Sequence, residues 1–129
     1  MNLRALAGLG VLAVLLGALA YNLFSEGIRI GFVTTLSGGS AAIGADMRDA
    51  FELALDHMDR KMAGHPVTVL YEDDAQNPDV GLQKTERLVQ RDGVQFVTGY
   101  IWSNVLLASY RAATERGVFV ISANAGPAE

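Results

Sequence analysis

The sequence of 129 residues contains no cysteine, which excludes disulfide bonds and metal sites built on thiolates. It also lacks any excess of positive charge, because 10 Lys and Arg residues stand against 14 Asp and Glu residues, for a net charge of −4 at pH 7. The basic residues are scattered among acidic ones and form no patch, so we expect no nucleic-acid partner. A chain of this length is sufficient for one domain.

The first twenty residues lack charged side chains apart from Arg4. Residues 5–17 are a run of Ala, Leu, Val and Gly, and a small-residue site, Ala18-Leu19-Ala20, follows it. This order predicts a secretory signal peptide at residues 1–20 that is cleaved after Ala20. The mature residues 21–129 then carry a net charge of −5, because only Arg4 is lost. The alternative is an apolar segment that stays uncleaved as a membrane anchor, since its length is near the lower limit of ~17 residues for a span.

The stretch over residues 28–62 predicts a strand, a loop of small residues and an amphipathic helix. We place the strand at 28–33 and the helix at 45–62, with Gly64 as its stop. Such a strand–loop–helix unit commonly binds small ligands, because loop N–H groups and the helix dipole favour an anion. The G-x-x-x-x-G frame of a nucleotide loop is present at 39–44, but the Lys and Ser or Thr that must follow are missing. The remaining alternative for this loop is a tight connection without a ligand.

Strand and helix patterns alternate along the rest of the chain, with strands at 67–71, 94–97 and 118–121 and helices at 78–91 and 103–116. Asn77 and Ser103 are the expected N-caps of the two helices, and Pro78 suits a first turn. The run at 118–121 is wholly apolar, so we expect it to be buried on both sides. The pattern predicts an α/β fold, a parallel sheet with helices on both faces and right-handed crossovers.

Ligands bind such sheets at the carboxyl ends of the strands. Three loops are expected to meet there, at residues 37–44, 99–103 and 122–126, with the loop at 72–77 on the same edge. Ser103 is either a cap whose hydroxyl and neighbouring N–H groups bind an anion or a cap without a ligand. Trp102 beside it is either a pocket wall or a packing residue. A nucleophilic role for Ser103 is disfavoured, since no G-x-S-x-G elbow surrounds it.

Metal and cofactor chemistry is not expected. The two histidines, His57 and His65, are isolated from other candidate ligands, so we interpret both as structural or surface residues. Asp73 and Asp74 follow a predicted strand, where a magnesium-dependent enzyme could place its acids. No Lys or Thr on a later strand end completes such a site, so a turn and capping role is favoured.

Four motifs in order give the chain a family likeness. It resembles the periplasmic substrate-binding proteins of ABC transporters, of the branched-chain amino acid (leucine-binding) type. The likeness covers everything after the predicted signal peptide, and no single motif is specific alone. The motifs are Ile28-Arg29-Ile30-Gly31-Phe32-Val33-Thr34-Thr35-Leu36-Ser37-Gly38 with Gly44, Glu72-Asp73-Asp74 with Pro78, Gly99-Tyr100-Ile101-Trp102-Ser103, and Ile121-Ser122-Ala123-Asn124-Ala125.

The resemblance implies a type I periplasmic binding fold of two α/β lobes that close on a ligand. It implies that Ser103 holds the ligand carboxylate through its hydroxyl and backbone N–H, and that the loop at Ala125 contacts the amino or equivalent group. We therefore name Ser37, Trp102, Ser103, Asn124 and Ala125 as candidate ligand-binding residues. Gly126-Pro127 stands where the leucine-binding proteins carry a Thr-containing segment, and Trp102 is compatible with an aromatic or other small carboxylate as ligand.

Family members are much longer than this chain, so residues 21–129 are interpreted as part of the first lobe, from a fragment or a truncated gene. The expected function is that of a secreted, periplasmic solute-binding protein, not an enzyme. Its expected partners are a small-molecule ligand, an amino acid or related carboxylate, and ABC permease subunits. Two alternatives stay open at this point. One is the ligand-sensing domain of a membrane receptor with the same fold, and the other is an α/β hydrolase that uses Ser103.

Overall fold

The computed structural model describes residues 27–122 and 124–126. The predicted signal peptide, its cleavage site and the alternative anchor lie outside these residues. The described elements are, in order, β1 (Ile28–Thr34), the 3-10 helix η1 (Gly38–Ser40), α2 (Ala41–His57), β2 (Lys61–Met62), β3 (His65–Asp73), α3 (Pro78–Gln90), β4 (Phe96–Thr98), α4 (Ser103–Thr114) and β5 (Phe119–Val120).

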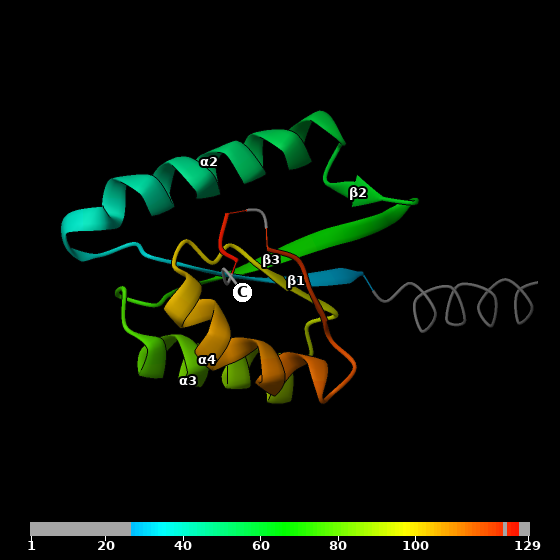
Figure 1. Cartoon of the computed structure of the whole chain (residues 1–129). Coiled ribbons are helices and arrows are strands. Elements are labelled where there is room, and N and C mark those ends of the chain that lie inside the picture. The colour runs from blue at the N-terminus through cyan, green and yellow to red at the C-terminus, as the bar shows by residue number, and fades with distance from the viewer. Residues whose placement is uncertain (1–26, 123, 127–129) are drawn as a thin grey trace, which may run out of the picture.

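A five-stranded sheet in the order β2-β3-β1-β4-β5 forms the centre of the molecule. Strand β1 is paired in parallel with β3 on one side and with β4 on the other, and β4 is paired in parallel with β5. Only the two-residue β2 runs antiparallel, beside β3. Helix α2 covers one face of the sheet, and α3 and α4 cover the other (Figure 1). The predicted parallel sheet with helices on both faces is therefore confirmed.

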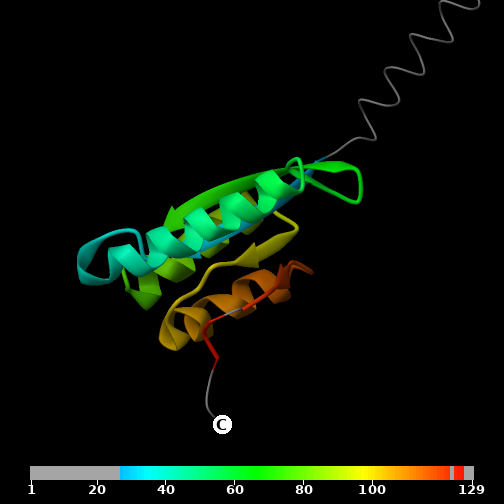
Figure 2. The ribbon, with the colours of Figure 1, turned by 90° about the horizontal axis from the view of Figure 1, so that it is seen from above.

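The core is much thicker on one face of the sheet than on the other. Between the sheet and α3 and α4 lies a cluster of nine buried residues: Val33, Leu88, Val94, Val97, Tyr100, Val105, Leu106, Ala113 and Ala125. On the α2 face only Ile30, Leu55 and Val67 are buried together. Figure 2 shows α2 lying along the β1 and β3 side of the sheet. The face over β4 and β5 is therefore left with little cover.

Helix α2 begins and ends earlier than the sequence indicated. It starts at Ala41, where we expected loop as far as residue 44, because Gly44 is accommodated within the first turn. It ends at His57, since Asp59 and Arg60 take positive φ values of 52° and 51°, which a helix cannot continue through. The predicted helix at 45–62 was thus wrong at both ends.

Gly64 belongs to a hairpin rather than to a helix stop. Ala63 and Gly64 have φ values of 51° and 84°, which is the pattern of a two-residue type I′ turn. The turn joins β2 to β3, with Met62 opposite His65 and Lys61 opposite Pro66. Glycines with positive φ occur both at helix ends and in hairpin turns. The local sequence around Gly64 therefore did not distinguish a helix end from a hairpin.

The apolar run at 118–121 is not buried on both sides, which corrects our expectation. Phe119 is 67% exposed and Ile121 is 56% exposed. Only Phe119 and Val120 pair in β5, at the edge of the sheet, and no described helix covers this edge on the α2 face. The burial of an apolar strand depends on which other elements of the fold cover it. The sequence of the strand alone does not contain this information.

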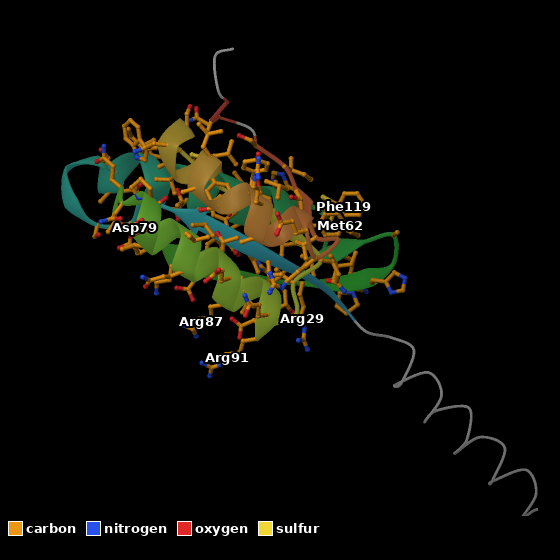
Figure 3. The ribbon with its side chains drawn as sticks, turned by 60° about the horizontal axis from the view of Figure 1, so that its bottom comes forward. Arg29, Met62, Asp79, Arg87, Arg91 and Phe119 are labelled. Atoms are coloured by element: carbon orange, nitrogen blue, oxygen red, sulfur yellow. The ribbon has the colours of Figure 1, made fainter. Side chains whose placement is uncertain are left out.

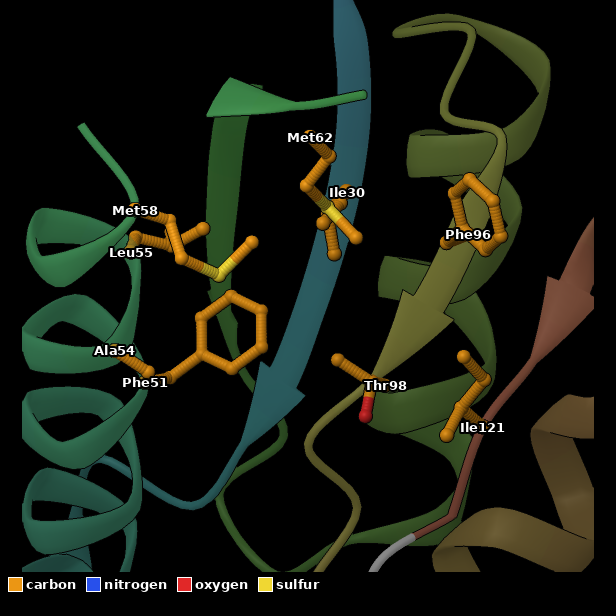
Figure 4. Close-up of a pocket in the computed structure, with 9 residues that line it drawn as sticks. All are labelled: Ile30, Phe51, Ala54, Leu55, Met58, Met62, Phe96, Thr98 and Ile121. Carbon is orange, nitrogen blue, oxygen red and sulfur yellow. The ribbon is translucent and has the colours of Figure 1, made fainter. Parts of the chain in front are cut away.

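An apolar pocket lies on this thinly covered face. It has a volume of about 220 Å³, and nine residues line it, namely Ile30, Phe51, Ala54, Leu55, Met58, Met62, Phe96, Thr98 and Ile121. Figure 4 shows the side chains of α2 on one side of the pocket and those of Phe96, Thr98 and Ile121 on the other. This pocket shares no residue with the candidate ligand-binding residues.

The start of α3 was predicted correctly. Asn77 is its N-cap, and the Asn77 side-chain oxygen accepts from the N–H groups of Asp79 and Val80 at 2.9 and 3.3 Å. Pro78 fills the first helical position. Towards the other end of α3, Arg87 pairs with Glu72 of β3 at 3.2 Å, and Arg91 extends away from the sheet (Figure 3). Within the described residues, no helix has the length and apolar character needed to cross a membrane.

Candidate functional site

The loops that follow β1, β3, β4 and β5 meet at the carboxyl edge of the sheet, as the sequence predicted. The Thr35 hydroxyl, after β1, donates to Asp74 Oδ1, after β3, at 2.6 Å. Trp102 Nε1, after β4, donates to Thr35 Oγ1 at 3.1 Å. The Asn124 amide, after β5, donates to the Ile101 carbonyl at 3.0 Å. Side-chain hydrogen bonds therefore tie all four loops together.

Ser103 is the first residue of α4 and not its N-cap, which corrects our prediction. Trp102 occupies the cap position, and its side chain makes no capping hydrogen bond. The first backbone hydrogen bond of the helix runs from Leu106 N to the Trp102 carbonyl at 3.0 Å, so the N–H groups of residues 103–105 have no partner within the helix. Asn77 caps α3, whereas no side chain caps α4 or α2, so the first turn of α4 is open.

The Ser103 hydroxyl donates to the Gly126 carbonyl at 3.0 Å. It thereby links the start of α4 to the loop after β5. In this position the hydroxyl is oriented by a neutral carbonyl, whereas a nucleophilic serine needs a base that removes its proton. The geometry therefore does not favour the hydrolase alternative, and a ligand-binding role of Ser103 stays a prediction.

Trp102 is half-buried and packs against the larger core cluster. Its indole N–H is directed at Thr35, which is fully buried. The indole surface that remains open to solvent is consequently carbon. The interpretation of Trp102 as a packing residue is confirmed, because part of the ring contacts the core, and its role as a pocket wall stays a prediction.

Asn124 and Ala125 lie in the loop that contacts the start of α4. Asn124 is an exposed residue, but its side-chain amide N–H donates a hydrogen bond to the Ile101 carbonyl. Ala125 is buried, and its carbonyl accepts a hydrogen bond from the Ser122 hydroxyl. These contacts show what holds the loop in place, and a ligand contact of either residue stays a prediction.

Ser37 is exposed and precedes η1. Its loop is held by Asp73, because Asp73 Oδ1 accepts from Leu36 N and from Ala75 N, each at 2.8 Å. Partial burial alone would raise the pKa of Asp73, but hydrogen bonds from Leu36, Ser37 and Ala75 outweigh it and hold the pKa below its ordinary value. Asp73 thus holds the loop that carries Ser37.

Two residues of this edge, Thr35 and Asp74, were not among the predicted ligand-binding residues. Thr35 lies within the predicted loop, and Asp74 was assigned a turn role, which is confirmed by its acceptance of the Gln76 N–H at 2.8 Å. Their mutual contact joins residues 39 positions apart, and the contact from Trp102 to Thr35 joins residues 67 positions apart. Among these residues, only the two aspartates after the strand at 67–71 could be assigned a role, in a turn, from the neighbouring sequence.

The described residues hold no group of three or more His, Cys, Asp or Glu side chains placed to bind a metal ion.

Glu52, near the middle of α2, forms a separate polar cluster with Arg60 and Tyr71. The Arg60 guanidinium donates to Glu52 Oε2 at 2.7 Å, and the Tyr71 hydroxyl donates to Glu52 Oε1. Hydrogen bonds from Arg60 and then Tyr71 lower the pKa of Glu52. This cluster joins α2 to β3 and lies apart from the loop edge.

Comparison with known proteins gives a family match over all of the described residues. The sequence profile of the family described as periplasmic binding protein matches residues 27–129. The Leu/Ile/Val-binding protein homolog 2 of Brucella abortus is 32% identical over 115 residues, which are 88% of this chain and 30% of that protein. The chain therefore spans about 30% of the length of the curated relatives that it matches.

Solved structures of substrate-binding proteins have the same fold. The branched-chain amino acid substrate-binding protein of Streptococcus pneumoniae, in complex with isoleucine, gives a TM-score of 0.74 at 29% identity, over 79% of this chain and 30% of that one. A solute-binding protein of Rhodopseudomonas palustris, in complex with 3,4-dihydroxybenzoic acid, gives 0.73 at 27% identity, over 77% of this chain and 27% of that one. Each likeness covers under a third of the larger protein.

Proposed function

Because this chain belongs to the periplasmic binding protein family, we propose that it is the extracytoplasmic solute-binding part of an ABC uptake system for a small carboxylate. The relatives reported above are named as binding proteins and not as enzymes, which agrees with our expectation for this chain. The match over residues 27–129 is the observation that carries the proposal. A permease partner follows from the same role and belongs to the proposal.

A carboxylate is the chemistry that the loop edge suits. The relatives with bound ligands hold isoleucine and 3,4-dihydroxybenzoic acid, which share a carboxylate and an otherwise mainly hydrocarbon body. In this chain the open N–H groups of residues 103–105 and the dipole of α4 favour an anion at the start of the helix. The Ser103 hydroxyl lies at the same point and can exchange the Gly126 carbonyl for the ligand.

The other candidate residues complete one wall of the proposed site. Trp102 contributes carbon surface beside Ser103, and Ser37 contributes an exposed hydroxyl from the loop after β1. Asn124 and Ala125 come from the loop after β5 and are proposed to face the part of the ligand opposite its carboxylate. Ligand sites usually enclose most of the ligand surface, so the described residues are proposed to act together with a second lobe.

Export is the second part of the proposal. The family is periplasmic by description, and residues 1–20 have the order of regions that a signal peptide requires. We propose cleavage after Ala20, so that mature protein begins at Tyr21. N-terminal sequencing of the exported protein measures this directly. Recovery of Met1 in a membrane fraction supports instead the receptor alternative, with residues 5–21 as an anchor.

The ligand-binding role is tested by calorimetry on Ser103→Ala, with L-isoleucine and benzoate as probes. A hydrogen bond to a charged group contributes ~1.5–3 kcal/mol, so affinity for a carboxylate should fall roughly tenfold or more. Ser109→Ala is the matched control, because Ser109 is a buried serine of the same helix that faces α3. Equal affinity in Ser103→Ala and the unmodified protein, or equal losses in both variants, contradicts the assignment of Ser103.

A further inference from the structure

A buried hydroxyl joins three of the loops at the carboxyl edge. Thr35 Oγ1 donates to Asp74 Oδ1 at 2.6 Å and accepts from Trp102 Nε1 at 3.1 Å. Thr35 and Asp74 are both fully buried. The three residues come from the loops after β1, β3 and β4, so the pair of hydrogen bonds connects the wall of the proposed site to the interior.

Only one direction of donation satisfies all three groups. An indole N–H can only donate, and a hydroxyl has a single proton. Asp74 Oδ1 already accepts from the Gln76 N–H at 2.8 Å, so this oxygen acts as an acceptor. The Thr35 proton must therefore point to Asp74, which leaves an oxygen lone pair of Thr35 for the indole. Asp74 sets the orientation of the hydroxyl, and the hydroxyl sets the orientation of Trp102.

Asp74 is itself held firmly in place. Its backbone N–H donates to the Thr34 carbonyl at 3.0 Å, which continues the pairing of β3 with β1 by one residue. Its carbonyl accepts from Asn77 N at 2.8 Å, which links it to the cap of α3. The backbone is equally confined at Thr35, because the first turn of α2 contacts it at Gly44. Thr35, which accepts from the indole, and Asp74, which accepts from Thr35, are thus both held in place.

We propose that Asp74 and Thr35 are positioning residues that fix the Trp102 indole beside Ser103 with its nitrogen edge turned inward. Resting on the function proposed above, this assigns the wall at Trp102 to the hydrocarbon body of the ligand. The indole N–H is already engaged, so the ring offers a ligand only its carbon face. The site then favours carboxylates with a large apolar or aromatic body over those without one.

The positioning role is tested with isosteric changes at Thr35. Thr35→Val keeps the shape of the side chain and removes its hydroxyl, whereas Thr35→Ser keeps the hydroxyl. The matched control is Thr85→Val, because Thr85 is equally buried and its hydroxyl is also hydrogen-bonded, to the Gly81 carbonyl at 2.8 Å and to Tyr100 Oη at 2.7 Å. This control breaks a comparable contact in which the indole takes no part.

The readout is the indole N–H signal of Trp102 in the NMR spectrum of the full chain, whose sequence contains a single tryptophan. In Thr35→Val we expect this signal to move upfield and its exchange with solvent to become roughly tenfold faster, because the acceptor is lost. Thr35→Ser and Thr85→Val should leave both properties close to those of the unmodified protein. An unchanged indole signal in Thr35→Val, or an equal change in Thr85→Val, overturns the positioning role.

The selectivity is measured as the ratio of the affinities for benzoate and acetate, two carboxylates that differ in their hydrocarbon body. We expect this ratio to fall several-fold in Thr35→Val and to recover in Thr35→Ser. An unchanged ratio in Thr35→Val, with a displaced indole signal, overturns the ligand-facing role of Trp102. Absence of binding by either probe to the unmodified protein rejects the proposed function instead, while the indole signal still decides the positioning role.

Discussion

Replacement of Gly44 by alanine reverses the usual effect of that substitution in a helix. In an exposed helix, Gly→Ala stabilises by ~1 kcal/mol, because alanine has the higher helix propensity. In α2, a Cβ atom at Gly44 would lie 1.9 Å from the Thr35 carbonyl oxygen and 2.7 Å from the Thr35 carbonyl carbon. Both atoms belong to the backbone, so no rotamer change relieves the contact.

The magnitude follows from the distance. An ordinary contact between heavy atoms is ~3.5 Å, so the first turn of α2 and Thr35 must separate by roughly 1.5 Å. Overpacking of this kind costs ~1–3 kcal/mol and outweighs the gain in helix propensity. We expect Gly44→Ala to lower the free energy of unfolding by up to about 2 kcal/mol. Gly44→Ala should also displace the Trp102 indole, because the Thr35 hydroxyl accepts the hydrogen bond from the indole N–H.

Urea unfolding of the full chain, followed by tryptophan emission, measures the effect. Gly39→Ala is the control, because a Cβ atom at Gly39 would have no heavy atom within 4 Å and its φ is not positive. The control should change the free energy of unfolding by less than ~0.5 kcal/mol. If Gly44→Ala is as stable as the unmodified protein or more stable, the close approach of α2 to Thr35 is refuted.

Two further predictions concern the core and the open face of the sheet. Burial raises the pKa of Tyr100 to about 12, above the ~10 of an unfolded tyrosine. The free energy of unfolding should therefore be unaffected by this group below about pH 10. It should fall by about 3 kcal/mol as the pH rises from 10 towards 12, because the unfolded tyrosine loses its proton first. Urea midpoints over this range should fall less steeply in Tyr100→Phe, and an equal fall contradicts the assignment. The exposed Phe119 and Ile121 should make the chain self-associate. Sizing chromatography should show smaller species after Phe119→Ser with Ile121→Ser, and unchanged elution contradicts this.

The parts of the fold that the sequence predicted well depend on local chemistry. Asn77 and Pro78 mark the start of α3 because a cap and a fixed φ act within one turn. The order of strands and helices follows from hydrophobic period, and the convergence of the loops follows from parallel topology. The family likeness rested on the same loops and is confirmed by the match over residues 27–129.

The parts that were predicted wrongly depend on contacts distant in sequence. Position 44 of α2 requires a glycine because the helix approaches the Thr35 backbone at this point. No helical pattern in the sequence reveals that approach. Phe119 and Ile121 are exposed because the edge beyond β4 lacks cover on the α2 face, not because their residue types differ from those of a buried strand. Ser103 resembles a cap in sequence, but its hydroxyl donates to Gly126. The hydrogen bonds of Thr35 were equally hidden from a reading of neighbouring residues.

The central claim is that a small carboxylate binds at the loop edge, at the start of α4. A titration of isotope-labelled protein with benzoate, followed by backbone amide NMR signals, tests it most directly, because weak binding still shifts the signals of contacting residues. We expect the largest shifts at the amides of residues 103–105 and at the Trp102 indole. Largest shifts at Ile30 and Phe96, in the apolar pocket, or no shifts anywhere, would contradict it.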